Sequence, residues 1–267
     1  MVLTFRDFTS ALRDLDLDRE SPIIAHASLS AFGEVRGGSD TILGSLLATV
    51  NTVVMPTFTY KTMLIPETGP ENNGIVYGDG QDLNRMAEFF TPDMPADTLM
   101  GETAETLRLH PQARRSAHPI LSFSGIRAEK ILESQSLNDP LAPIQEILAA
   151  EGWVVLLGVN HTVNTSVHYA EKLAGRKQFV RWALTPIGVL ECPGFPGCSD
   201  GFNTLDEHLK DVSRIVTLGE SQIQAVSLID LIAEVKSLIA QNPLALLCSR
   251  EECERCDAVR CQVQQAG

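Results

Sequence analysis

The sequence predicts an α/β protein with a mixed, mostly parallel central sheet, helices on both faces of that sheet, and a small antiparallel appendage. Short apolar runs without polar alternation are typical of strands buried on both faces, and segments with helical spacing separate them. Two further runs flank Thr185-Pro186, which favours an antiparallel pair joined by a tight turn. With no internal repeat and no linker, we expect a single domain over residues 1–267.

The first part of the chain predicts two helix–strand units. Residues 5–15 place apolar side chains at helical spacing, and the apolar run 23–25 after a Ser-Pro pair indicates a buried strand. A second helix is expected over 39–49, followed by a strand over 53–55 that a proline closes. Alternation of this kind is typical of a parallel sheet covered on both faces.

Periodicity is weak between Thr57 and Met100, where several prolines, glycines and asparagines interrupt any pattern. An irregular stretch of this length inside a compact domain is usually a functional loop or lid. We therefore interpret residues 59–100 as a functional loop or lid and residues 244–267 as a separate cysteine-containing C-terminal segment.

Regular patterns return after residue 100. The run 153–159 is the clearest buried strand in the sequence, and Ser227 is expected to cap a helix that ends near residue 240. The other expected elements are helices at 102–109, 126–132 and 143–150, a strand at 120–123, and antiparallel pairs at 179–184 with 188–191 and at 213–218 with 222–226.

Charge and composition exclude several classes of protein. The chain has 34 acidic and 21 basic residues, a net charge of −13, which repels nucleic acids and anionic membranes and attracts polycationic ligands. No leader pattern or membrane-length apolar run is present, and six cysteines are too few for a disulfide scaffold, so we expect a cytoplasmic protein. A monomer or a homodimer fits the sequence, and the lack of a long apolar stripe favours a monomer.

The segment that follows the strand 153–159 carries the best candidate catalytic group. In a helix, Asn164, His168 and Glu171 share one face, with Thr165 beside them. A neutral imidazole can accept a proton from an amine, and a neighbouring carboxylate stabilises the resulting cation. A solvated helix face explains the same residues, and spacing alone favours that alternative.

Two further segments are candidates for binding phosphate groups. Gly37-Gly38, after a small-residue turn that follows His26, could bring backbone N–H groups to a pyrophosphate, although a simple strand-to-helix connection with a core histidine is equally compatible. The basic cluster around Arg114-Arg115, with Ser116 and His118, suits a phosphate or a solvated face equally well.

The cysteines allow two interpretations. Cys248, Cys253, Cys256 and Cys261 have the spacing C-x4-C-x2-C-x4-C, and four thiolates can bind zinc or an iron–sulfur cluster. Because a single C-x2-C pair supports this, we favour free thiols and predict no metal. Cys192 and Cys198 flank a turn-rich loop, and no base that would make either one a nucleophile can be identified.

Four blocks of the sequence together resemble the aminoglycoside 3-N-acetyltransferase family. They occur in order as HASLSAFGEVRGGSDTILGSLL, VVMPTFTY, GETAETLRLHPQARRSAHPILSFSG and LLGVNHTVNTSVHYAEK. The resemblance covers residues 23–175 and implies a three-layer α/β/α fold. It also implies an acetyl-CoA-dependent enzyme that transfers an acetyl group directly to the 3-amino group of an aminoglycoside, a small polycationic amine.

The resemblance also implies roles for single residues. His168 would be the general base, oriented by Glu171 and Asn164, with Thr165 near the thioester and His26 in the same pocket. The coenzyme would be bound by Ser28, Val35, Gly37, Gly38, Thr41, Arg115, Ser116 and His118. The resemblance places the loop 59–100 at one wall of the acceptor pocket, and this loop does not match a known resistance enzyme, so a different amine acceptor is one alternative. A coenzyme-binding protein without transferase activity, in which the C-terminal cysteines sense metal or redox state, is the other.

Overall fold

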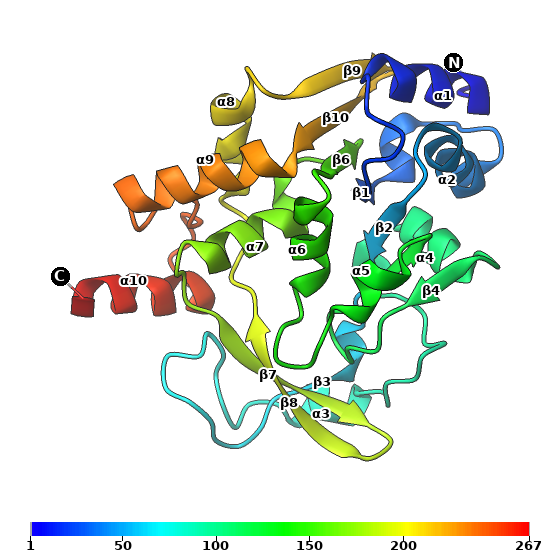
Figure 1. Cartoon of the computed structure of the whole chain (residues 1–267). Helices are drawn as coiled ribbons and strands as arrows, with labels where there is room; N and C mark the ends of the chain where they lie inside the picture. The colour runs from blue at the N-terminus through cyan, green and yellow to red at the C-terminus, as the bar shows by residue number, and fades with distance from the viewer. Residues whose placement is uncertain (1, 267) are drawn as a thin grey trace.

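The computed structural model describes residues 2–266 and contains a seven-stranded sheet with helices on both faces (Figure 1). The strand order is β4-β5-β2-β1-β6-β10-β9, and a second sheet has the order β3-β7-β8. The strands are β1 (Ile23–Ala27), β2 (Val53–Pro56), β3 (Met63–Leu64), β4 (Ala113–Arg115), β5 (Phe123–Ile126), β6 (Trp153–Leu157), β7 (Phe179–Thr185), β8 (Gly188–Phe195), β9 (Arg214–Leu218) and β10 (Ser221–Ser227).

The helices form the two outer layers. They are α1 (Phe5–Asp14), α2 (Gly38–Thr49), α3 (Gln81–Met86), α4 (Glu102–Leu109), α5 (Glu129–Glu133), α6 (Ala142–Ala149), α7 (Thr165–Leu173), α8 (Leu205–Leu209), α9 (Leu228–Gln241) and α10 (Glu254–Ala266). Among residues 2–266, no helix combines the length and the apolar character that a membrane crossing needs.

Two apolar cores lie on opposite faces of the main sheet. One core joins α1, α2 and α4 to one face, and the other joins α5, α6, α7 and α9 to the opposite face. Strand β1 serves both cores, because Ile23 and Ala25 face the first and Ile24 faces the second. This arrangement confirms the predicted three-layer α/β/α fold.

The antiparallel appendage is also confirmed. β7 and β8 form the predicted hairpin, and the two-residue strand β3 from the irregular segment joins its edge. Phe179 and Phe195 of the hairpin pack into the same core as α6, α7 and α9. The small sheet therefore lies at one end of the molecule, continuous with one helical layer (Figure 1).

Parallel pairing is confined to the centre of the main sheet and does not predominate as expected. β1 pairs in parallel with β2 and β6, whereas the other four neighbouring pairs are antiparallel. At one edge β9 and β10 form a hairpin, and short connections of this kind join antiparallel strands. At the other edge, the long segment after β2 leads into β4, and the chain then turns back into β5, which is antiparallel to both β4 and β2.

Several element boundaries differ from the expected ones. The strand expected at 120–123 is β5, three residues later, because the buried bends at 118–122 precede regular pairing. The helix expected at 126–132 is the shorter α5, and β4 and α10 were not predicted. The segment 59–100 is not structureless, since it contains β3 and α3.

Candidate active site

A cavity of about 770 Å³ opens at the carboxyl ends of the parallel strands β1, β2 and β6. Ligands in open α/β sheets usually bind at this edge, where loops from neighbouring strands diverge. Its wall includes Ala27 at the end of β1, Pro56 at the end of β2 and Val159 just after β6. The sheet therefore provides part of the cavity wall, and segments outside the sheet provide the rest.

His168 lines this cavity and forms a buried pair with Glu171. Both residues lie on α7, and His168 Nδ1 is 2.9 Å from Glu171 Oε2. Glu171 is only 2% exposed, and its other carboxylate oxygen accepts a hydrogen bond from Arg176 Nη1 at 3.1 Å. Because Nδ1 is bonded to the carboxylate, Nε2 is the ring nitrogen available to a ligand.

Arg176 connects this pair to the C-terminal part of the chain. Its Nη2 donates to the carbonyl oxygens of Pro243 and Ala245, at 3.0 and 2.9 Å. Burial lowers the pKa of Arg176, while the neighbouring Glu171 raises it. A buried arginine with satisfied donors is rigid, so it fixes the carboxylate that in turn orients His168.

The beginning of α7 also lies at the cavity. Asn164 is the N-cap, and its side chain accepts a hydrogen bond from Ser166 N at 3.0 Å. Its amide nitrogen lies 3.1 Å from His161 Nδ1, so the side chain of Asn164 bonds the helix start and His161 and forms no hydrogen bond with His168. Asn164 and Thr165 both line the cavity, as sequence spacing predicted.

His26 lines the same cavity and acts as a hydrogen-bond acceptor. Thr165 N donates to His26 Nε2 at 3.4 Å, across 139 residues of sequence. Burial, with a smaller contribution from His161, lowers the pKa of His26 to about 3. His26 is therefore a neutral imidazole that ties the end of β1 to the start of α7, and His168 is the better candidate for accepting a proton.

Charged residues from outside the main sheet also line the cavity. Arg181 from β7 and Arg255 from α10 contribute guanidinium groups, and Asp200 contributes a carboxylate. Burial lowers the pKa of Arg181 to about 10, and its Nη1 donates to Asn73 O at 3.0 Å. The cavity lining thus includes residues of both signs of charge, supplied by segments outside the main sheet.

The residues predicted for the coenzyme form two groups that do not line the cavity. Ser28, Val35 and Gly37 lie in the connection between β1 and α2, whereas Gly38 and the buried Thr41 lie in the first turn of α2. Gly37 has φ 85°, and a Cβ atom there would lie 2.6 Å from Thr41 Oγ1, which explains the glycine.

The second group is occupied by internal hydrogen bonds. Arg115 donates to Thr57 O at 2.6 Å, and Ser116 Oγ accepts from Phe123 N at 2.9 Å. His118 Nδ1 accepts from the backbone N–H groups of residues 120 and 121, and burial lowers its pKa to about 4. In this structure these three side chains brace the connection into β5.

Sequence analysis did not identify Arg176, Asp200, Arg181 or Arg255. For Arg176 a signal existed, because Gly175, with φ 78°, follows α7 and turns the chain back along the helix. Arg176 N then donates to Glu171 O at 2.9 Å, which brings the arginine beside the carboxylate. The other three residues come from a hairpin strand, a loop and α10, whose placement at the cavity depends on tertiary contacts.

The fold and the site define an α/β protein whose ligand cavity contains a buried histidine–carboxylate pair suited to general acid–base catalysis. The chain belongs to the aminoglycoside 3-N-acetyltransferase family, whose model matches residues 24–240.

Curated relatives carry related names. The chain is 30% identical over 178 residues to the SPbeta prophage-derived aminoglycoside N(3')-acetyltransferase-like protein YokD of Bacillus subtilis, which covers 63% of this chain and 64% of that protein. It is 33% identical over 184 residues to aminoglycoside N(3)-acetyltransferase IX of Micromonospora chalcea, which covers 64% of this chain and 63% of that protein. The chain therefore spans slightly less than two thirds of either relative.

Solved structures show the same fold. The apoenzyme of aminoglycoside acetyltransferase AAC(3)-IVa has a TM-score of 0.79 and 24% identity, covering 97% of this chain and 98% of that one. A mutant of that enzyme in complex with a gentamicin has a TM-score of 0.76 at 23% identity, covering 97% of each chain. The AAC-IIIb binary complex with CoASH has a TM-score of 0.72 at 22% identity, covering 90% of this chain and 97% of that one.

Proposed function

We propose that this protein is an acetyl-CoA-dependent N-acetyltransferase that acetylates the 3-amino group of an aminoglycoside. The observation that carries the proposal is the pair formed by His168 and Glu171 at the wall of the cavity, 2.9 Å apart. Membership of the aminoglycoside 3-N-acetyltransferase family supports the reaction type.

In the proposed reaction His168 is the general base. The acceptor nitrogen attacks the thioester carbonyl, and His168 Nε2 takes a proton from that nitrogen as the C–N bond forms. The C–S bond then breaks, the coenzyme sulfur leaves with the bonding electrons, and the imidazolium returns the proton to it. Glu171, fixed by Arg176, stabilises the imidazolium through Nδ1, and no acetyl-enzyme intermediate is formed.

The cosubstrate is proposed to be acetyl-CoA, in line with the related enzyme bound to CoASH. The apolar part of the cavity wall, with Met55, Phe58 and Met100, suits the pantetheine arm that carries the thioester. The assignment of Ser28, Val35, Gly37, Gly38, Thr41, Arg115, Ser116 and His118 to the coenzyme remains a prediction. The internal hydrogen bonds of Arg115, Ser116 and His118 favour the turn before α2 over the second group.

The acceptor is proposed to be polycationic. A related enzyme binds a gentamicin, and the net charge of −13 would concentrate such a ligand near this protein. Residues 59–100 are proposed as the acceptor side of the cavity, since Tyr60, Met63, Ile75 and Leu99 line it. Asp200 also lines the cavity; Arg250 pairs with its Oδ2, and its carboxylate would in addition pair with an ammonium of the acceptor.

A second candidate acceptor is an amine that also carries an anionic group. Arg255 lines the cavity, and guanidinium groups bind carboxylates and phosphates well. Its Nη1 donates to Gly197 O, whereas both terminal nitrogens of Arg181 already donate to backbone carbonyls of residues 73, 74 and 180. An ordinary aminoglycoside has no anionic group for Arg255. This alternative keeps the chemistry at His168 and changes only the compound that is acetylated.

The test is turnover of acetyl-CoA, followed as thiol release, against aminoglycosides, simple polyamines and amino acids or amino sugars that carry an acid group. Acetylation of an aminoglycoside at its 3-amino group, located by NMR of the product, is the expected result. Preference for an acid-bearing amine would favour the second candidate, and no thiol release with any amine would contradict the proposal.

We propose that the enzyme is cytoplasmic and is a monomer or a homodimer. Each chain is proposed to form a single domain. No disulfide joins the six cysteines, all of which lie among the described residues, and this supports a reducing compartment.

A further inference from the structure

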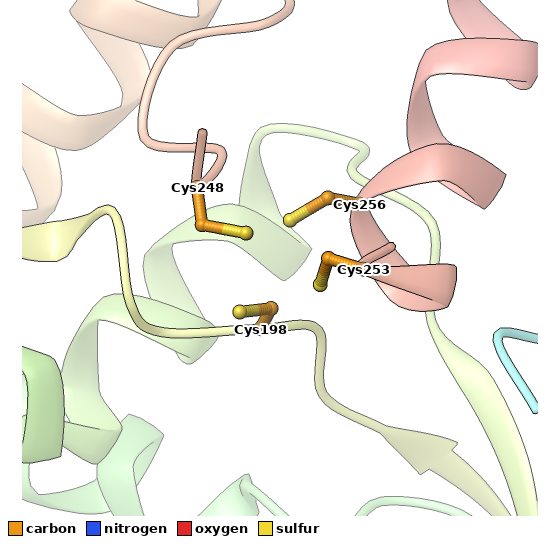
Figure 2. A group of neighbouring side chains, drawn as sticks. All are labelled: Cys198, Cys248, Cys253 and Cys256. Carbon is orange, nitrogen blue, oxygen red and sulfur yellow. The ribbon is translucent and has the colours of Figure 1, made fainter. Parts of the chain in front are cut away.

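Four cysteine side chains from distant parts of the sequence meet beside the cavity (Figure 2). Cys198 lies in the loop after β8, Cys248 and Cys253 precede α10, and Cys256 lies in the first turn of that helix. All four are buried, and their sulfur atoms lie within 4.8 Å of one another. Cys261, predicted from spacing to belong with them, is exposed and outside the group.

The arrangement matches the ligand set of a single tetrahedral metal ion. Zinc in structural sites takes four thiolates at about 2.3 Å, which places the sulfurs about 3.8 Å apart. Cys253 and Cys256 form the C-x2-C pair that such sites use at the start of a helix. The compact spacing suits one ion better than a cluster of several irons.

The surroundings suit the charge of such a site. Four thiolates around a dication have a net charge of −2, and three arginines lie nearby. Arg250 Nη2 is 3.7 Å from Cys198 Sγ, and Arg260 donates to the carbonyl oxygen of Cys248. Arg176, which fixes Glu171, is close enough to Cys256 to interact with its charge.

We propose that Cys198, Cys248, Cys253 and Cys256 bind one zinc ion, which fastens the C-terminal segment to the loop after β8. The inference does not depend on the proposed reaction. It replaces the prediction of free thiols, which considered Cys261 and did not include Cys198.

The fastened segments form part of the cavity wall. Arg255, between two of the ligands, lines the cavity and donates to Gly197 O at 2.9 Å. Gly74 of the irregular segment packs so tightly on Arg255 that a Cβ atom there would lie 2.9 Å from the Cα of Arg255. The zinc site thus positions Arg255 against both the loop after β8 and the segment around Gly74.

The first experiment measures metal in the full-length protein purified without chelators. Native mass spectrometry and elemental analysis are expected to find about one zinc ion per chain. Titration of the wild-type thiols with a mercurial reagent is expected to release that zinc to a chromogenic chelator. Cobalt exchanged into the site is expected to give the ligand-field bands of a tetrahedral thiolate complex.

Serine variants identify the ligands. Cys198→Ser and Cys256→Ser should reduce retained zinc about tenfold or more after dialysis against a chelator. Cys192→Ser, which changes a buried cysteine outside the group, and Cys261→Ser should retain it. The proposal is overturned if wild-type protein contains no stoichiometric zinc, contains iron, or has disulfides among these cysteines, or if Cys261→Ser loses the metal while Cys198→Ser keeps it.

Discussion

At the scale of single residues, the site depends on a chain of contacts that ends at His168. Arg176 bonds Glu171, and Glu171 bonds the imidazole, with the carboxylate and guanidinium groups nearly inaccessible to water. Inside a protein, a charge that loses its partner is costly because water cannot replace it. Breaking any of these contacts should therefore lower both stability and catalytic activity.

Replacing Arg176 tests this dependence. Arg176→Gln leaves the buried Glu171 without its cation, so we expect a loss of about 3 kcal/mol in the free energy of unfolding and slower turnover. Arg85→Gln is the matched control, because its pair with Asp82 is exposed and should contribute less than about 1 kcal/mol. If urea denaturation gives the same loss of unfolding free energy for both variants, the buried pair of Arg176 and Glu171 does not have the importance proposed for it.

Two buried histidines predict how stability depends on pH. His26 and His118 have folded-state pKa values of about 3 and about 4, below the value of 6.5 for an exposed histidine. Below about pH 6.5 the unfolded chain binds protons that the folded chain does not. Stability is therefore fully present above the unfolded pKa and is lost as pH falls toward the folded values.

The expected loss is up to about 1.4 kcal/mol per pH unit for each histidine, and burial lowers the pKa of His161 as well. Asparagine at position 118 can accept the same two backbone N–H groups without titrating, so His118→Asn should lower the slope of unfolding free energy between about pH 6 and pH 5 by about 1 kcal/mol per pH unit. An unchanged slope would show that His118 does not contribute to the pH dependence of stability.

The sequence could predict local patterns at this scale and could not predict distant contacts. The helical spacing of Asn164, His168 and Glu171 was sufficient to place the last two side chains together. The contacts of His26 with Thr165, and of Cys198 with the C-terminal cysteines, join residues far apart in the sequence. No local pattern contains that information, so Cys261 was chosen where Cys198 belongs.

At the scale of elements, α7 is the helix that positions the catalytic pair in the cavity. Its N-cap Asn164 lies in the cavity wall, and its C-terminal turn returns Arg176 to Glu171. Strongly periodic elements such as α9 and β6 were predicted nearly to the residue. β4 and β3 were missed because short edge strands owe their form to pairing with a neighbour and not to their own sequence.

Two helix caps separate stability from function. Asn164→Ala and Ser227→Ala each remove a side chain that accepts a backbone N–H at the start of a helix, so each should cost about 1 kcal/mol of stability. Asn164→Ala should also reduce turnover, because its helix carries His168, whereas Ser227→Ala should leave turnover unchanged. Thermal unfolding and steady-state kinetics on both variants check this; equal loss of turnover would refute the special role of α7.

At the scale of the whole molecule, the acidic surface should steer cationic acceptors. The net charge of −13 attracts a polycation over distances that salt screens, with a Debye length of about 10 Å at 0.1 M ionic strength. We expect kcat/KM for an aminoglycoside to fall about tenfold between about 0.01 M and about 0.3 M salt. A monoamine should change less than about twofold, and a salt-independent aminoglycoside rate would contradict electrostatic steering.

The overall architecture followed from the alternation of helical and apolar segments, and the cavity lies where an α/β sheet places ligands. The antiparallel direction of the edge strands could not be predicted from the sequence. Local sequence indicates that a strand exists, but it does not indicate which neighbouring strand it pairs with. The far wall of the cavity depends on the irregular segment, the hairpin and α10, which come together only in the folded chain.

The most direct test of the central claim compares His168→Ala with His208→Ala in acetyl-CoA turnover with an aminoglycoside. His208 is a half-exposed surface histidine near Glu234, so its variant controls for the loss of an imidazole as such. We expect His168→Ala to lower kcat by about 10²- to 10⁴-fold while the protein stays folded, and His208→Ala to match the wild type. Wild-type turnover by folded His168→Ala would contradict its assignment as the general base.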